Sequence, residues 1–196
     1  MKGDVYVHPT ALCESERVGD GTRVWAFAHV LPGAIIGRNC NLCDHTFVDT
    51  GAVVGNSVTV KNGIAIWDKV VIEDNVFLGP NVAFTNDMRP RAALKKDPSE
   101  FLATLVERGA TVGANATIIC GVRIGRSAFV AAGATVTKDV PSHALVMGTP
   151  ARRMGWVCEC GQTLPGDLAC ECGRRYQLDL GAGGLSAIAA RADGPA

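Results

Sequence analysis

The stretch of sequence that decides the fold is residues 18–84, VGDGTRVWAFAHVLPGAIIGRNCNLCDHTFVDTGAVVGNSVTVKNGIAIWDKVVIEDNVFLGPNVAF. Every sixth residue from Val18 to Phe84 is apolar, and most of these residues are β-branched. A second series of mostly small residues runs from Thr22 to Val82, four positions later in each unit. A fixed short period is the signature of a solenoid, in which stacked repeats bury one continuous core. We therefore predict short strands separated by turns, with three units closing one coil and coils stacking at about 4.8 Å.

The repeat is interrupted once. Its six-residue register breaks after Phe84 and returns at Val112, at a distance that is not a multiple of six. We therefore expect an inserted loop over about residues 85–109, and loops this long inside a compact domain are usually functional. The second half of the loop, PSEFLATLVERG, is predicted to form a short helix with Ser99 as its N-cap and Gly109 as its terminator. The predicted fold class is all-β, a parallel β-helix of hexapeptide repeats interrupted by one long loop.

Beyond the repeat the sequence changes character. We predict a β-helix domain over residues 1–156, a cysteine-rich pair of knuckles over 157–178 and a disordered, low-complexity tail over 179–196. The knuckles contain a C-x-C-G…C-x-C-G pattern, formed by Cys158, Cys160, Cys170 and Cys172. Four thiolates suit a structural zinc ion, as in a zinc ribbon. Ribbons normally have two or more residues between paired ligands, so the spacing leaves open whether zinc binds.

Composition excludes several classes of protein. The chain of 196 residues has a formal net charge of zero, whereas a nucleic-acid-binding protein would carry a basic surface. The first residues, MKGDVYVHPT, contain no apolar segment of a signal peptide. No apolar run approaches the roughly 18 residues of a membrane span. We therefore expect a cytoplasmic protein without a membrane partner, whose eight cysteines are core residues, metal ligands or nucleophiles rather than disulfides.

Four stretches carry a resemblance to a known family. They are CDHTFVDTGAVVG (43–55), WDKVVIEDNVFLGPNVAFTND (67–87), GATVGANATIICGVRIG (109–125) and AFVAAGATVTKDVPSHALVMGTPAR (128–152). Together they resemble the left-handed β-helix acyltransferases. They are most similar to the nucleotide-sugar N-acetyltransferases that act on a 3-amino group, either of UDP-2-acetamido-3-amino-2,3-dideoxyglucuronate or of dTDP-3-amino-3,6-dideoxyhexoses. Enzymes of this kind serve the biosynthesis of cell-surface polysaccharides or glycosylated natural products.

The resemblance implies the left hand of the helix, a homotrimer, and acetyl-CoA bound in the groove between neighbouring β-helices. The long loop would then form a wall of the nucleotide-sugar site. Asn86 matches the asparagine of the family's Phe-Thr-Asn box, which lies near the sugar amine and the thioester. Its side-chain oxygen could orient the amine, although an amide cannot act as a base.

Stacking places further candidates around Asn86. Positions 18 residues apart should lie above one another, so Asp68 is expected one strand spacing from Asn86, where it could hold Asn86 or take a proton. Trp67 and Asp49 fall in the next column, beside the acceptor site. Stacked Asp and Thr residues at such turns also commonly satisfy backbone N–H groups. His45 is the strongest candidate base by its titration range, but it would have to serve the site of a neighbouring subunit.

Further residues are assigned to the two substrates. The resemblance points to backbone groups of the chain for the pantetheine arm of CoA, at Ala131, Gly133, Thr135 and Pro150. Three cations are candidates for its phosphates, namely Lys138, Arg152 and Arg153. Loop residues that could meet the acceptor nucleotide are Asp87, Arg89 and Arg91.

Other functions remain as alternatives. The acyl acceptor could be an amine or hydroxyl that is not part of a nucleotide. A metal-dependent hydratase of the γ-carbonic-anhydrase type is a different class on the same fold, but it needs several histidines that converge on zinc. The four histidines here, at positions 8, 29, 45 and 143, are scattered. An inactive β-helix scaffold would leave the Phe-Thr-Asn-Asp box and the loop unexplained.

Overall fold

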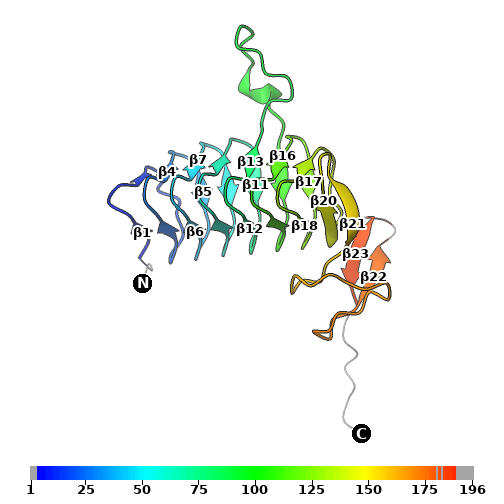
Figure 1. Cartoon of the computed structure of the whole chain (residues 1–196). Coiled ribbons are helices and arrows are strands. Elements are labelled where there is room, and N and C mark those ends of the chain that lie inside the picture. Colours follow the sequence, from blue (N-terminus) through cyan, green and yellow to red (C-terminus); the bar gives the residue numbers. More distant parts are fainter. Residues whose placement is uncertain (1–3, 180, 182, 189–196) are drawn as a thin grey trace.

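The computed structural model describes residues 4–179, 181 and 183–188, and most of them form a parallel β-helix (Figure 1). The first face is a nine-stranded sheet of β1 (Tyr6–Val7), β3 (Arg23–Val24), β6 (Asn41–Leu42), β9 (Thr59–Val60), β12 (Phe77–Leu78), β15 (Thr111–Val112), β18 (Phe129–Val130), β20 (Ala144–Met147) and β21 (Arg152–Trp156). The second is a seven-stranded sheet of β2 (Leu12–Cys13), β4 (His29–Val30), β7 (Phe47–Val48), β10 (Ala65–Ile66), β13 (Ala83–Phe84), β16 (Thr117–Ile118) and β19 (Thr135–Val136). The third is a five-stranded sheet of β5 (Ile35–Ile36), β8 (Val53–Val54), β11 (Val70–Ile72), β14 (Thr104–Val106) and β17 (Arg123–Ile124).

The predicted repeat is confirmed by the strand register. Ala65 of β10 pairs with Phe47 of β7 below it and with Ala83 of β13 above it, which is the spacing of one coil. From Val24 to Phe84 the large-residue series is buried, with at most 5% of any member exposed. The small-residue series is buried from Thr22 to Val82. One large and one small inward residue per strand therefore fill the narrow interior at every level.

The inserted loop is shorter than predicted. The β-helix resumes at β14, whose Val106 pairs with Ile72 and is fully buried, so the insertion covers residues 85–103 rather than 85–109. The predicted helix is wrong. Only a 3-10 turn, η1 (Pro98–Glu100), forms, and Asp97 rather than Ser99 is its N-cap. Parallel pairing of β14 with β11 and β17 overrides the weak helical propensity of the segment that follows.

The C-terminal part departs from the coil pattern. Strand β21 turns back and pairs antiparallel with β20, and two cysteine knuckles follow. The chain then forms a hairpin of β22 (Tyr176–Asp179) and β23 (Gly184–Ala187). The prediction of a disordered tail from residue 179 is therefore wrong for β23. Leu185 in this strand is buried, and its N–H donates to the carbonyl of Ser142 at 3.1 Å. The rest of that tail, at residues 180, 182 and 189–196, lies outside the described residues.

The described residues contain no helix that is both long and apolar enough to cross a membrane.

Candidate active site

The loop leaves the β-helix at one corner, between β13 and β14, and projects away from the solenoid (Figure 1). Both ends of the loop are fixed to the coils. The backbone N–H of Leu102 donates to the carbonyl of Asn86 at 3.1 Å, which closes the loop at its base. The Thr85 hydroxyl accepts the N–H of Cys120 from the coil above at 2.9 Å. Asn86 therefore has a rigid backbone, while its half-buried side chain makes no hydrogen bond within the described residues.

Trp67 and Asp49 support this corner from below. The indole N–H of Trp67 donates to the carbonyl of Phe84 at 2.8 Å, and its ring packs on the ring of Phe47 at 5.6 Å between centroids. The two carboxylate oxygens of Asp49 accept the N–H groups of Thr50 at 2.8 Å and Asp68 at 3.3 Å. Asp49 thus satisfies turn amides, and the indole of Trp67 is tied into the corner of the loop.

Asp68 lies one coil below Asn86, but the two side chains do not bond to each other. A methyl group added to Gly51 would collide with a carboxylate oxygen of Asp68, so that carboxylate leans toward the coil below. Its oxygens accept no hydrogen bond within the described part of the chain. The 18-residue stacking therefore predicts the column of Asp68 and not the direction of its side chain.

Lys69 is a residue that the sequence reasoning missed. Its ammonium donates to three carbonyls on the far side of the loop, those of Pro98 at 2.7 Å, Ser99 at 3.2 Å and Phe101 at 3.1 Å. The 18-residue spacing that places Asp68 beneath Asn86 also places Lys69 beneath Asp87, so this spacing is a signal by which Lys69 could have been found. Lys69 holds the returning arm of the loop against the β-helix.

The charged residues of the loop divide between structure and surface. The carboxylate of Asp87 pairs with the Lys96 ammonium and accepts the N–H of Arg89 at 2.8 Å. The pKa of Asp87 is lowered, first by the hydrogen bond from Lys96 and then by that from Arg89. Asp87 therefore shapes the loop, whereas the side chains of Arg89 and Arg91 are exposed and available to an acceptor.

His45 occupies a different corner of the β-helix, between β6 and β7. Its ring stacks on the exposed ring of Phe27, with 5.0 Å between centroids and 15° between planes. Within one chain His45 and Asn86 are therefore apart, which agrees with the separation that their positions in the coil predict.

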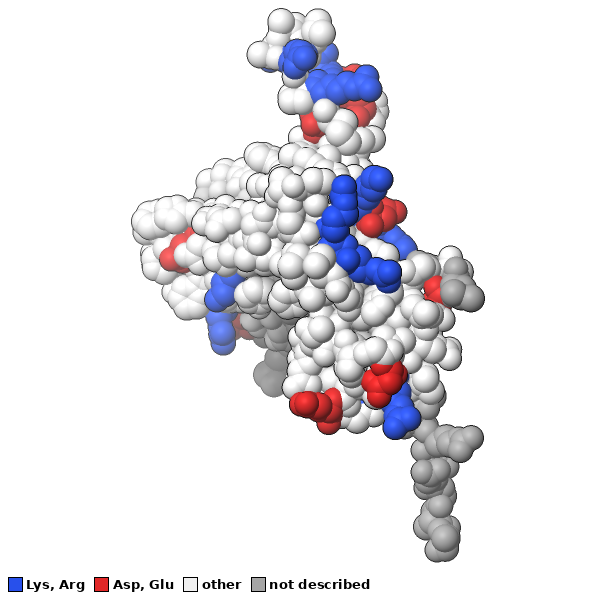
Figure 2. Space-filling view, turned by 45° about the vertical axis from the view of Figure 1, so that its right-hand side comes forward, with Lys and Arg blue, Asp and Glu red and all other residues white. Residues whose placement is uncertain are grey.

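The residues assigned to CoA lie at the C-terminal end. Lys138, Arg152 and Arg153 line one pocket of about 300 Å³, and Pro150 lies exposed in the turn between β20 and β21. Figure 2 shows basic side chains gathered in this part of the molecule, between the loop and the C-terminal segment.

The backbone N–H groups assigned to the pantetheine arm are already engaged. Ala131, Gly133 and Thr135 donate to carbonyls of the same chain at 2.8 to 3.0 Å. An arm could therefore not pair with these three N–H groups as an added strand, and the basic pocket is the better-supported element of a CoA site.

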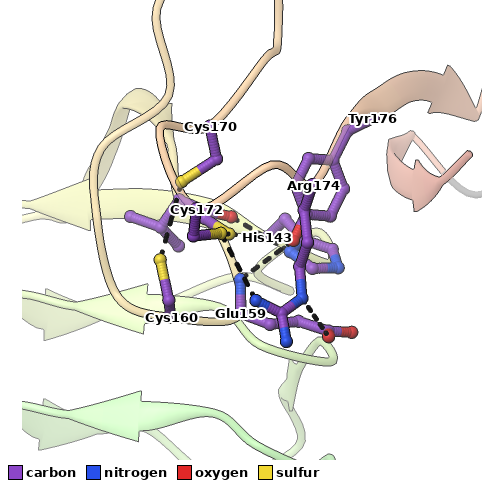
Figure 3. A network of polar contacts seen from close by, with 9 residues as sticks. His143, Glu159, Cys160, Cys170, Cys172, Arg174 and Tyr176 are labelled. Carbon is purple, nitrogen blue, oxygen red and sulfur yellow. Dashed lines mark hydrogen bonds and ion pairs between the residues drawn. The ribbon is translucent and has the colours of Figure 1, made fainter. Parts of the chain in front are cut away.

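The four cysteines of the knuckles converge. Their Sγ atoms all lie within 4.8 Å of one another, and none is in a disulfide. Figure 3 shows Cys160, Cys170 and Cys172 with the Arg174 guanidinium beside them. The pKa of Cys172 is lowered to about 6, first by a hydrogen bond from the backbone of Arg174 and then by one from its side chain. Such a group of thiols suits a tetrahedral zinc ion.

Comparisons with known proteins agree with this geometry. Residues 17–50 match the family described as bacterial transferase hexapeptide (six repeats), and residues 104–138 match the hexapeptide repeat of succinyl-transferase. These matches assign the left hand to the β-helix. The acetyltransferase domain of PglB from Neisseria gonorrhoeae, in complex with acetyl coenzyme A, shares the fold with a TM-score of 0.57, 21% identity, and coverage of 78% of this chain and 58% of that one. A hexapeptide-repeat acetyltransferase of Vibrio cholerae, complexed with acetyl coenzyme A, gives a TM-score of 0.55 at 25% identity, over 63% of this chain and 70% of that one.

A closer similarity extends over nearly the whole chain. The dTDP-3-amino-3,6-dideoxy-α-D-galactopyranose 3-N-acetyltransferase of Aneurinibacillus thermoaerophilus is 52% identical over 88% of this chain and 90% of that protein. Together with the repeat and the loop that carries Asn86, this similarity shows that the chain belongs to the hexapeptide-repeat acyltransferases, and among them to the nucleotide-sugar N-acetyltransferases.

Proposed function

We propose that this protein transfers the acetyl group of acetyl-CoA to the amino group of a dTDP-linked 3-amino-3,6-dideoxyhexose. Such a product would enter a cell-surface polysaccharide or a glycosylated natural product, inside the cytoplasm where the nucleotide sugar is made. The observation that carries the proposal is the 52% identity to a 3-N-acetyltransferase of this substrate class. The carboxamide of Asn86, which is held at the base of a loop and makes no hydrogen bond to any described residue, supports it.

The reaction needs a neutral amine, a polarised thioester carbonyl and a path for one proton. The amine nitrogen bonds to the carbonyl carbon, the C–S bond breaks, and CoA leaves as a thiolate that takes up the proton released by the amine. Because a thiolate is a good leaving group, positioning can supply most of the rate. The side-chain oxygen of Asn86 would accept one amine N–H and so direct the lone pair toward the thioester carbon.

Two residues compete for the role of a base. Within the described residues the carboxylate of Asp68 has no hydrogen-bond partner, and it lies in the column of Asn86, on the coil below. His45 lies at another corner and could act only in the site of a neighbouring subunit. We assign positioning to Asn86 and include a His45 variant in the test.

We also propose a homotrimer with acetyl-CoA in the groove between subunits. Leu12 is 53% exposed and Phe27 is 59% exposed near the N-terminal end, and large apolar side chains of this kind favour a second copy as their cover. In the CoA site, Lys138, Arg152 and Arg153 would pair with phosphate oxygens.

A structural zinc ion is the further cofactor we propose. The Sγ atoms of Cys158 and Cys172 lie 3.5 Å apart, as do those of Cys160 and Cys170. Zinc–sulfur bonds of about 2.3 Å in a tetrahedron place thiolates about 3.8 Å apart, which is close to this arrangement.

The test is release of CoA thiol from acetyl-CoA with a panel of dTDP- and UDP-linked 3-amino sugars. We expect turnover with a dTDP-3-amino-3,6-dideoxyhexose, a fall in kcat of about 100-fold in Asn86→Ala, and little change in His45→Ala. Loss in His45→Ala with retention in Asn86→Ala would replace positioning by a base from the neighbouring subunit. No thiol release with any nucleotide sugar would refute the proposed acceptor.

A further inference from the structure

The two cysteine knuckles are copies of one turn. In each, the N–H of the first cysteine donates to the carbonyl four residues ahead at 2.8 Å, and the glycine three residues ahead donates back at 2.9 Å. That glycine, Gly161 or Gly173, has φ 90, a conformation that side chains rarely adopt. The turn is thus completed after the second cysteine, which explains how one intervening residue still lets both thiols face the other knuckle.

Other side chains support the thiols. The hydroxyl of Tyr176 lies 3.1 Å from the Sγ of Cys158 and accepts the N–H of Glu159 at 3.0 Å. The Arg174 guanidinium donates to the Sγ of Cys172 at 3.3 Å and lies 3.6 Å from the Glu159 carboxylate (Figure 3). Such contacts orient ligands and balance the negative charge that four thiolates bring to a metal.

The segment around the knuckles has little core of its own. We call residues 157–179 with 183–188 the cysteine module. The buried residues that pack together in it are Cys158, Leu164, Cys170, Tyr176 and Leu185. Two of the five are the proposed ligands, and segments this small usually need a metal or disulfides to fold.

The module rests on the last corner of the β-helix. His143 donates from Nδ1 to the carbonyl of Val157 at 3.0 Å, and the Val157 N–H donates back to the carbonyl of His143 at 2.8 Å. The ring of buried His143 lies 4.8 Å from the ring of Tyr176. A methyl group on Gly184 would come within 2.8 Å of the Ser142 backbone, so β23 also packs directly on this corner.

Trp156 joins the module to the basic pocket. It packs against the core of the β-helix and also against the core of the module. Its carbonyl accepts the N–H of Leu164 at 2.8 Å, and the Arg153 guanidinium lies 4.3 Å above its ring. Arg153 and Arg152 belong to β21, which pairs only with β20 among the described strands. One edge of β21 is therefore held by the sheet and its end by the module.

We infer that the zinc-loaded cysteine module acts as a clamp on β21 that fixes Arg152 and Arg153 for the phosphates of CoA, an inference that rests on the proposed function. The metal joins the two knuckles, the knuckles hold Tyr176 and Trp156 in place, and Trp156 holds the Arg153 guanidinium. Zinc loading then sets the affinity for CoA, although the metal takes no part in acyl transfer.

The test uses the full-length protein and the double variant Cys160→Ser/Cys172→Ser, since both thiols are exposed and serine leaves the buried ligands in place. The matched control is Cys13→Ser, a thiol on the first coil that is remote from the knuckles. Metal content is measured by mass spectrometry and CoA binding by calorimetry without any acceptor. We expect one zinc per chain in the wild type and the control, and none in the double variant. We expect CoA affinity to fall about tenfold, the loss of roughly one charged contact to a phosphate.

A wild-type protein that contains no zinc after refolding with the metal would overturn the inference at its first step. If zinc binds but its loss leaves the CoA affinity unchanged, the module is attached to the β-helix without acting as a clamp on β21. That result would refute the inference. If the double variant misfolds, zinc is instead removed from the wild type with a chelator and then added back. CoA affinity must fall when zinc is removed and recover when it returns. An unchanged affinity again refutes the clamp. Because CoA binding is measured without a sugar, a wrong acceptor would not affect this result.

Discussion

Replacing Lys69 with methionine keeps the aliphatic length of the side chain and removes the ammonium that holds the loop. Three carbonyls, those of Pro98, Ser99 and Phe101, lose their donor. Hydrogen bonds from a charged group contribute about 1.5–3 kcal/mol each when well shielded. Water solvates the half-buried Lys69 ammonium when the loop opens, which offsets part of this energy. We therefore take about 2 kcal/mol as the contribution of the three hydrogen bonds together to the closed loop.

That energy belongs to opening of the loop and not to unfolding of the β-helix, because within the described residues the Lys69 ammonium donates only to carbonyls of the insertion. A loss of about 2 kcal/mol shifts the closing equilibrium about thirtyfold toward the open loop. If the closed loop forms a wall of the acceptor site, kcat/KM for the nucleotide sugar falls by up to about this factor. The KM for acetyl-CoA and the melting temperature change little.

Thiol-release kinetics with each substrate varied in turn measure the effect, and hydrogen exchange across residues 91–101 reports the opening directly. Lys61→Met is the matched control, because the Lys61 ammonium makes no hydrogen bond within the described residues. Lys69→Arg keeps the charge and should recover part of the activity. Unchanged exchange and unchanged kcat/KM in Lys69→Met would refute the claim that this ammonium closes the loop.

Two further predictions concern the β-helix itself. In Gly37→Ala the new methyl would lie 2.5 Å from the carbonyl carbon of Gly55 in the next coil, so we expect a loss of about 1–3 kcal/mol in calorimetric unfolding; Gly155→Ala, whose methyl meets nothing within 4 Å, should stay within about 1 kcal/mol of wild type. Burial lowers the pKa of His143 below its usual 6.5, so the unfolded chain binds a proton more readily and stability should decline as the pH falls below about 6.5. Melting curves between pH 8 and 5 should show this slope in wild type and a smaller one in His143→Phe, and equal slopes would exclude His143 as the source.

The sequence predicts the β-helix well because each coil repeats the same inward positions. Val24 and Thr22 stand for two series whose burial follows from spacing alone. The end of the loop is a different case. Residues 104–106 begin the returning coil without the turn residues that normally precede a strand. Beside the polar insertion, this single repeat therefore cannot be recognised from the sequence pattern. Only pairing with β11 and β17 identifies them as a strand, and that pairing joins residues far apart in the chain.

The candidate site is predictable by column and not by side-chain direction. Spacing placed Trp67 and Asp68 at the corner of the loop, and the bond from Trp67 to the Phe84 carbonyl agrees with it. Spacing could not show that Asp68 leans over Gly51, because that depends on the room a glycine leaves. Spacing also could not show that Asp49 accepts hydrogen bonds from turn amides. An aspartate that contacts the acceptor and one that satisfies turn N–H groups would both stand at this position.

The two appendages follow one physical rule. Neither the loop nor the cysteine module buries enough apolar surface to hold its own shape, whereas the stacked coils form a rigid scaffold whose register is fixed at every level. Each appendage is therefore held by a side chain of the β-helix, the loop by the Lys69 ammonium and the module by the ring of His143. A substitution at either anchor should change the geometry of one substrate site and leave the other intact. Separate effects on acceptor and CoA kinetics are expected because different side chains hold the two appendages to the β-helix.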